Sequence, residues 1–330
     1  MALALGAGIA VPGGAIAAAS PAAPVSEAPA PAGAPSATPA AGALRLSVSG
    51  AGGTPRFALL GRRITIRGSV TPYVAGQQVQ LSFDLDGRAA GVRVAGVLPG
   101  PHGTGRFAVA FASRYGGLLR VRAAHAASAQ QAAFAASAPE LRYVDPNVGF
   151  GARGQSVRLL QSELSALHYA VPLSGVFDEA TGRALVAYRK VTGLERVAAA
   201  GARVFELLAR GAGAFHVRYP GDGRHVEADL AEQVLAEIEP GGRVYRIYTT
   251  SSGKPSTPTV LGRFRVYLKT PGENSEGMVD SNYFIRGYAI HGYAEVPTYA
   301  ASHGCLRVPI PDAPAIYAWV REGTPVDVYE

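Results

Sequence analysis

Hydrophobic residues recur at every second position between Leu44 and Ala138. Turns containing glycine or proline, among them Pro72 and Asp86-Gly87, divide this stretch into short runs. Such alternation places one side of each strand in a core and the other side in solvent. Residues 44–138 are therefore predicted to form a small antiparallel β-sandwich. The predicted inward-facing residues are Ile64, Ile66, Val70, Val79, Leu81, Phe83, Leu85, Phe107, Val109, Phe111, Leu119 and Val121.

Residues 148–211 change to the three- and four-residue spacing of helices. Val157, Leu160 and Leu164 would share one face of a first helix. A turn at Gly175 separates this helix from a second apolar stretch. We therefore predict a module of three helices.

The C-terminal segment, residues 214–330, is again rich in β-branched and aromatic residues. It is predicted to be mainly β, with one helix from Ala313 to Arg321 that places Trp319 in the core. The predicted strands are residues 215–219, 234–238, 244–248 and 264–268.

The first 43 residues differ in composition from the rest. Residues 1–19 are uncharged, are rich in Ala and Gly, and end in small residues, which favours a cleaved signal peptide. A disordered leader is the alternative. Residues 20–43 contain six prolines among Ala and Ser, and are predicted to be an extended linker. No other stretch is long and apolar enough for a membrane span.

Charge is unevenly distributed along the chain. Residues 1–213 contain 20 Lys and Arg against 10 Asp and Glu, and residues 214–330 contain 11 against 14. The resulting charges of +10 and −3 add to the +7 of the whole chain. The basic portion favours attraction to anionic polymers, which salt would weaken. Because its arginines are scattered and no nucleic-acid-binding motif accompanies them, nucleic acid is not expected as a partner.

The strongest candidate chemistry lies in Ser302-His303-Gly304-Cys305-Leu306-Arg307. Cys305 is the only cysteine, and its basic neighbours are expected to lower the pKa of the thiol. The glycine would allow a turn in which the amides of Gly304 and Cys305 point at one oxyanion. His291 lies upstream and offers a base. The alternatives are a buried structural cysteine and a zinc site made by His291, His303 and Cys305, although structural zinc usually has four ligands in paired motifs.

These residues resemble the signature of the L,D-transpeptidases, the family with YkuD-type catalytic domains. The resemblance extends over about residues 214–330, and it implies a β-sandwich with the cysteine loop at the mouth of a cleft. The matching runs are Tyr283 to Gly292, Ser302 to Arg307, Thr250-Ser251-Ser252-Gly253, Thr257-Pro258, Gly262-Arg263-Phe264 and Gly323-Thr324-Pro325-Val326.

The resemblance also implies a role for each residue of the signature. Cys305 would be the nucleophile and His291 the base, with its ring oriented by the carbonyl of Gly292. His303 would support the thiolate and the loop. The residues assigned to the loop and its oxyanion hole are Ser302, Gly304 and Gly292, and those assigned to the substrate are Arg307 and Tyr283.

The two upstream segments resemble non-catalytic modules. Residues 148–211 are similar to peptidoglycan-binding domain 1, with Gly154-Gln155-Ser156-Val157 and Gly175-Val176-Phe177 among the matching runs. Arg189 stands where that family often has Gln, so glycan contacts are not carried over, and a bare three-helix bundle is the alternative. Residues 44–138 resemble immunoglobulin-like modules.

Together these features predict a secreted, wall-associated monomer that binds peptidoglycan stem peptides and glycan strands. The resemblance implies an L,D-transpeptidase that forms a cysteine thioester and makes 3-3 cross-links, and it implies no metal or organic cofactor. An L,D-carboxypeptidase and a non-catalytic wall-binding protein are the alternatives. Residues 214–330 alone are expected to retain the chemistry, because they contain the whole signature.

Overall fold

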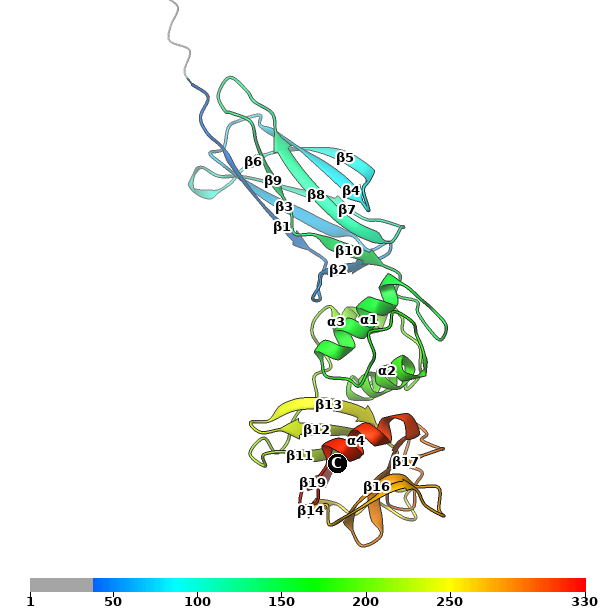
Figure 1. Ribbon diagram of the computed structural model, residues 1–330. Helices are drawn as coiled ribbons and strands as arrows, with labels where there is room; N and C mark the ends of the chain where they lie inside the picture. Colours follow the sequence, from blue (N-terminus) through cyan, green and yellow to red (C-terminus); the bar gives the residue numbers. More distant parts are fainter. Residues whose placement is uncertain (1–37) are drawn as a thin grey trace, which may run out of the picture. The chain divides into compact units, whose positions relative to one another are not determined.

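The computed structural model describes residues 38–330, which are mainly β, with four α-helices and four sheets (Figure 1). The predicted signal peptide, residues 1–19, and most of the predicted linker, residues 20–43, lie outside the described residues. None of the helices in residues 38–330 is long and apolar enough to cross a membrane.

The strands at the N-terminal end of the described chain form two sheets. One sheet has the order β1-β3-β7-β6, and the other has the order β2-β10-β8-β4-β5 with β9 paired to β8. The strands are β1 (Ala43–Ser49), β2 (Phe57–Leu59), β3 (Ile64–Thr71), β4 (Gln78–Leu85), β5 (Arg88–Gly96), β6 (Leu98–Pro99), β7 (Gly105–Phe111), β8 (Gly117–His125), β9 (Phe134–Ser137) and β10 (Leu141–Val144).

The inward-facing residues predicted from the alternating pattern all belong to one hydrophobic cluster between these sheets. Leu85, Val109 and Phe111 lie at its partly buried edge. Phe111 stacks on Phe83, with ring centres 4.4 Å apart. The period of two was therefore sufficient to predict the core of this sandwich.

Three helices occupy the segment in which a helical module was predicted. They are α1 (Gln155–Ala166), α2 (Glu179–Val191) and α3 (Ala202–Leu208). Val157, Leu160 and Leu164 are buried on one face of α1, as their spacing predicts. Asp178 caps α2, because its carboxylate accepts a hydrogen bond of 2.8 Å from the amide of Thr181.

The helices do not have a core of their own. One hydrophobic cluster joins them to strands β12 (Val234–Glu239) and β13 (Arg243–Thr249), and α2 packs against both strands (Figure 1). The chain after α1 also extends the sheet: Ala170 donates its amide to the carbonyl of Ile247 at 3.0 Å. The residues of β12 and β13 buried in this shared cluster are Val234, Ala236, Ile238 and Ile247, and β2 and β10 contribute Phe57, Leu59 and Val144.

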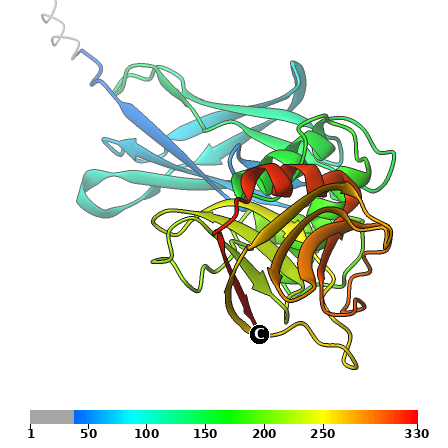
Figure 2. The ribbon, with the colours of Figure 1, turned by 60° about the horizontal axis from the view of Figure 1, so that its bottom comes forward.

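The two C-terminal sheets have the orders β13-β12-β11-β19-β14 and β15-β16-β17-β18. A third cluster, which includes Ile290, Leu306 and Trp319, is made of residues from both sheets and from α4 (Ala313–Trp319). Figure 2 shows α4, in red, against the orange strand β16. The remaining strands are β11 (His225–Asp229), β14 (Gly262–Arg265), β15 (Leu268–Glu273), β16 (Val279–Ile285), β17 (Tyr288–Tyr293), β18 (Leu306–Pro309) and β19 (Pro325–Tyr329).

Two predicted strands differ from the structure. Residues 215–219 are not a strand, because the amides of Arg218 and Tyr219 donate to the carboxylate of Glu227 at 2.9 and 2.7 Å. The predicted strand at 264–268 is divided between β14 and β15, which belong to different sheets. Alternation indicates that a segment is extended, but it does not identify the partner of its backbone.

Candidate active site

Strands β17 and β18 bring the two halves of the signature together as parallel neighbours. Ile290 lies opposite Leu306, and His291 lies opposite Arg307. Ile290 and Leu306 point into the core, so His291 and Arg307 point to the other face of the sheet. Cys305 directly precedes Leu306 and by the same alternation shares the face of His291.

The thiol of Cys305 is partly enclosed by backbone. Its Sγ lies 3.8 Å from the carbonyl oxygen of Gly287. Burial raises the pKa of this thiol, and the backbone of Ala289 and the charge of Arg307 oppose the rise without cancelling it. The expectation that basic neighbours lower the pKa is therefore wrong, because burial outweighs them. At neutral pH the residue is a thiol that needs a base.

His291 has the properties of such a base. Its side chain is 3% exposed, and its Nδ1 lies 2.9 Å from the carbonyl oxygen of Gly292. Because a carbonyl only accepts, Nδ1 carries the hydrogen and Nε2 keeps a free lone pair. Burial lowers the pKa of His291, and the hydrogen bond to Gly292 only partly opposes this. The imidazole is therefore neutral at neutral pH and can accept a proton.

Ser302 folds the loop that precedes Cys305. Its hydroxyl donates to the carbonyl of Cys305 at 2.6 Å and accepts from the amide of Gly304 at 3.0 Å. The amide of Gly304 is thus engaged inside the loop, so the predicted oxyanion hole of two free amides is not formed. The amide of Cys305 is the remaining member of the predicted pair.

Gly304 is required by the shape of this loop. Its φ is +122°, a backbone conformation that residues with a side chain rarely adopt. A Cβ at this position would lie 2.5 Å from the ring of Tyr288. Both the conformation and the close approach of the ring therefore exclude larger residues.

Residues 250–259 support the cysteine loop through hydrogen bonds. Ser251 and Arg307 exchange two backbone hydrogen bonds of 3.0 Å. The carbonyl of Ser252 accepts from the amides of Ala301 and Ser302 at 2.8 and 2.9 Å. The loop is therefore fixed on both sides of Cys305.

Thr259 is a supporting residue that the sequence did not indicate. Its hydroxyl donates to the carbonyl of Gly304 and accepts from the amide of Gly253, both at 2.9 Å. Thr259 lies 45 residues before Gly304 in the chain. No local sequence pattern connects two residues so far apart. Only the neighbouring Thr257-Pro258 run belongs to the matching signature.

His303 contacts Lys254. Its side chain is exposed, and its Nε2 lies 3.2 Å from the ammonium of Lys254. The structure brings His303 to Lys254, and the role that the resemblance implies for His303, support of the thiolate and the loop, stays a prediction.

Arg307 and Tyr293 extend the site along the sheet. The guanidinium carbon of Arg307 lies 4.0 Å from the ring centre of Tyr293, which in turn meets the ring of His291 edge to face at 5.7 Å. Tyr283 of β16 lies opposite Ala289, and therefore on the same face as His291. Four predicted site residues thus share one face: Cys305, His291, Arg307 and Tyr283.

The predicted zinc alternative has no geometric support in the part of the chain that the structure describes. Within residues 38–330, no group of three His, Cys, Asp or Glu side chains is arranged to hold a metal ion.

Known proteins share this arrangement of sequence and fold. The family of L,D-transpeptidase catalytic domains (YkuD) matches residues 223–328. An L,D-transpeptidase from Xylanimonas cellulosilytica DSM 15894, solved as residues 123–326, is 32% identical, with a TM-score of 0.51. The match covers 56% of this chain and 98% of that one. The chain belongs to the L,D-transpeptidase family.

Other solved L,D-transpeptidases are more distant. One from Stackebrandtia nassauensis is 20% identical, with a TM-score of 0.36, and the match covers 56% of this chain and 96% of that one. One from Mycobacterium tuberculosis H37Rv is 21% identical, with a TM-score of 0.30 and coverages of 33% and 58%. A comparison with curated proteins found no match.

The similarity to the Xylanimonas L,D-transpeptidase extends beyond the catalytic segment. Residues 214–330 number 117, or 35% of the 330 residues, whereas the match covers 56% of the chain. The match therefore includes upstream residues. Membership of the L,D-transpeptidase family makes the protein an acyltransferase.

Proposed function

We propose that Cys305 forms a thioester with a peptidoglycan stem peptide, and that the enzyme joins stems by 3-3 cross-links. The observation that carries this proposal is that Cys305 and His291 share one face of the β17–β18 pair. The thiol has a raised pKa, while the imidazole has a lowered pKa and a free Nε2. Such a pair can generate the nucleophile at the moment of attack.

The first half-reaction acylates the enzyme. Nε2 of His291 takes the proton of Cys305 Sγ, and the sulfur attacks the carbonyl carbon of the third residue of the donor stem. The amide of Cys305 is the candidate donor to the oxyanion. The bond to the terminal D-Ala then breaks, and the imidazolium of His291 gives its proton to the leaving amine.

The second half-reaction transfers the acyl group. The side-chain amine of the third residue of another stem attacks the thioester carbonyl and loses a proton to His291. The carbon–sulfur bond breaks, and the sulfur recovers a proton from the imidazolium. The products are the cross-linked stems and the free thiol, so no cofactor is consumed.

Mass spectrometry with a disaccharide-tetrapeptide tests this proposal. We expect the protein to gain the mass of the acyl group, D-Ala to be released and a dimer to form. Cys305→Ala should abolish all three, and its thermal unfolding should change little because no disulfide is lost. Formation of the disaccharide-tripeptide without the cross-linked dimer would indicate an L,D-carboxypeptidase. An unmodified wild-type protein with neither product would indicate a non-catalytic wall-binding protein.

We infer further that residues 148–211 bind peptidoglycan and that the protein acts outside the cytoplasm, at the cell wall. The resemblance of this segment to peptidoglycan-binding domain 1 and the charge of +10 in residues 1–213 support this. Sedimentation of the full-length protein with purified sacculi tests it. Binding that persists when salt shortens the screening length to about 3 Å indicates recognition of the glycan, whereas release indicates attraction by charge alone.

A further inference from the structure

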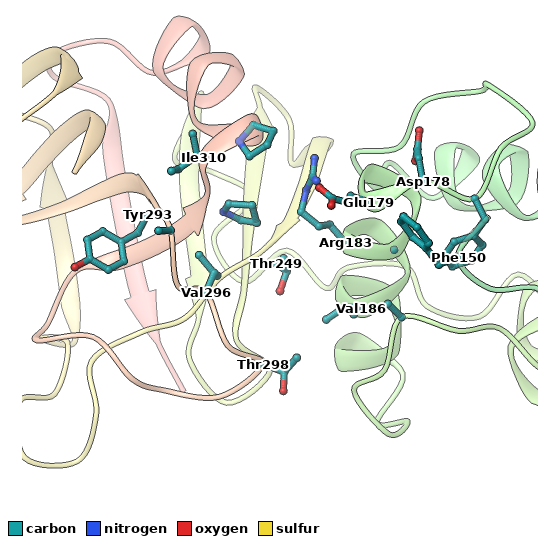
Figure 3. Close-up of a pocket in the computed structure, with 16 residues that line it drawn as sticks. Phe150, Asp178, Glu179, Arg183, Val186, Thr249, Tyr293, Val296, Thr298 and Ile310 are labelled. Atoms are coloured by element: carbon teal, nitrogen blue, oxygen red, sulfur yellow. The ribbon is translucent and has the colours of Figure 1, made fainter. Parts of the chain in front are cut away.

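A pocket of about 520 Å³ lies between α2 and the loops that follow β17 and β18 (Figure 3). Phe150, Arg183 and Val186 line its helical side. Val296 and Ile310 line the side of the catalytic segment. The volume falls within the range of small-molecule sites in proteins, which often lie where two structural units meet.

Tyr293 connects this pocket to the candidate active site. Tyr293 is one of the residues that line the pocket, and its ring, which points away from the pocket in Figure 3, contacts Arg307 and His291. The ring centres of Tyr293 and His291 are 5.7 Å apart. His291 and Tyr293 are alternate residues of β17, and Tyr293 is its last residue, so the pocket lies at the end of the strand that carries His291.

Both walls of the pocket are held in place by hydrogen bonds. Arg183 of α2 binds both carboxylate oxygens of Asp312, at 3.0 and 3.1 Å. Arg196, in the loop after α2, donates to the carbonyl of Thr298 at 2.6 Å. The pocket is therefore formed before a ligand arrives, which lowers the entropy cost of binding.

The lining selects against an anionic ligand. Arg183 is the only basic residue among the lining residues that the structure describes, and Asp312 neutralises it. Glu179 is exposed at the start of α2 and adds negative charge to the rim. A stem peptide carries carboxylates, so this charge disfavours it.

The apolar surfaces favour a flat, neutral ligand. Phe150 forms part of the pocket wall and is 77% exposed. Large aromatic side chains are usually mostly buried in folded proteins. An aromatic ring binds the apolar face of a pyranose, and small apolar side chains such as Val186 and Val296 accommodate an acetamido methyl group. The hydroxyl of Thr298 can bond to a sugar hydroxyl or acetamido group.

We propose that this pocket binds an N-acetylated amino sugar of the glycan strand that carries the stem peptide. This inference rests on the proposed function, because the sugar and the stem belong to one substrate. The pocket would hold the glycan while Cys305 reacts with the attached stem.

Two substrates that differ only in the sugar test this inference. The measured quantity is the ratio of kcat/KM for a disaccharide-tetrapeptide to kcat/KM for the free tetrapeptide. Phe150→Ala, at an exposed position, should lower this ratio about tenfold, which corresponds to about 1.4 kcal/mol of binding. Val186→Trp, which fills the pocket, should lower the ratio in the same way. Leu173→Ala should not, since Leu173 is exposed in the same helical segment but does not line the pocket.

A wild-type ratio near one, or an equal loss with both substrates, would overturn the proposal. An equal loss would assign the pocket to the peptide. Should the wild-type enzyme turn over neither substrate, the proposed function fails, and calorimetric titration with a dimer of N-acetylglucosamine decides the sugar site separately. Binding that Phe150→Ala weakens supports the site, and absence of binding refutes it.

Discussion

Lys190 of α2 donates a hydrogen bond of 2.7 Å to the hydroxyl of Thr249, the last residue of β13. The ammonium also lies 2.8 Å from the carbonyl oxygens of Gln233 and Thr250. Lys190 is 3% exposed, so three oxygen acceptors match the buried donor. Thr250 begins the segment that supports the cysteine loop, so a helix residue far from the signature helps to position it.

Lys190→Met is therefore expected to destabilise the protein by about 1–3 kcal/mol, because the buried oxygens lose their donor. The rate of Cys305 acylation should fall as well, since the supporting segment loses a fixed contact. Urea unfolding and mass-spectrometric acylation rates measure the two effects. Arg203→Met, at an exposed position on α3, is the matched control. An unchanged unfolding midpoint together with an unchanged acylation rate would contradict this role.

His291→Ala should lower kcat/KM by about 100-fold or more, the usual contribution of a positioned base. His303→Ala should have a much smaller effect, because His303 is exposed and lies beside Lys254. Steady-state kinetics of the two variants on one substrate make the comparison. Equal losses would show that His303 shares the role of base.

The pH dependence of Cys305 alkylation should report a thiol and not a resting thiolate. Burial raises the pKa of this thiol above its ordinary value of 9.0, so the rate with iodoacetamide should still increase above pH 9. Burial lowers the pKa of His291 below 6.5, so kcat/KM should fall only below that pH, as the base becomes protonated. An alkylation rate that levels off below pH 7 would indicate a thiolate–imidazolium pair instead.

Gly304→Ala should strain the loop, since φ is +122° and the new Cβ would lie 2.5 Å from the ring of Tyr288. We expect a loss of about 1–3 kcal/mol of stability and a large loss of acylation. Gly221→Ala is the control, because its Cβ would meet no atom within 4 Å and its φ is not positive. Combining Gly304→Ala with Tyr288→Ala removes the steric contact. Recovery in the double variant would assign the defect to the ring, and no recovery would assign it to the backbone conformation.

The buried pair of His225 and Glu227, 3.1 Å apart, predicts how stability depends on pH. Burial disfavours both charges, but their mutual hydrogen bond and backbone contacts outweigh it, so the pKa of His225 is raised and that of Glu227 is lowered. The contribution of His225 is complete below pH 6.5 and is lost as pH rises through its raised pKa. That of Glu227 is complete above pH 4.5 and is lost as pH falls through its lowered pKa.

The stability that this pair adds should therefore be largest between pH 4.5 and 6.5. Thermal unfolding of the wild-type protein and of His225→Gln across this range measures the difference. A difference that grows steadily from pH 6.5 to pH 9 would contradict the assigned charges.

The sequence predicted those parts of the molecule that depend on local pattern. The alternation of Ile64 and Ile66 located the sandwich core, and the spacing in α1 located its buried face. The signature also predicted that Cys305, His291 and Arg307 belong to one site. The parallel pairing of β17 and β18 brings both halves of that signature together.

The sequence-based predictions were wrong where the property of a residue depends on contacts that the fold creates. It predicted a lowered thiol pKa, because the burial that raises this pKa comes from the fold. It also assigned a free amide to Gly304, which the hydroxyl of Ser302 occupies.

The sequence also suggested that residues 214–330 would suffice for the chemistry. In the structure, removal of the helices would expose the face of the sheet that they cover. That face carries Val234, Ala236, Ile238 and Ile247, which are all fully buried. Such a fragment would expose a large apolar surface, and we expect it to aggregate.

The parallel pairing of β17 and β18 has a consequence for how such enzymes diversify. Two parallel neighbours cannot be joined by a tight turn, and the return of the chain takes about a dozen residues or more. Here the return is residues 294–305, which number 12 and end at Cys305. The parallel pairing thus requires a long segment that ends at Cys305. Insertions, deletions and substitutions in the first part of this return, before Ser302, can remodel the approach to the thiol while both strands stay unchanged, so substrate preference can change at little risk to the positions of Cys305 and His291.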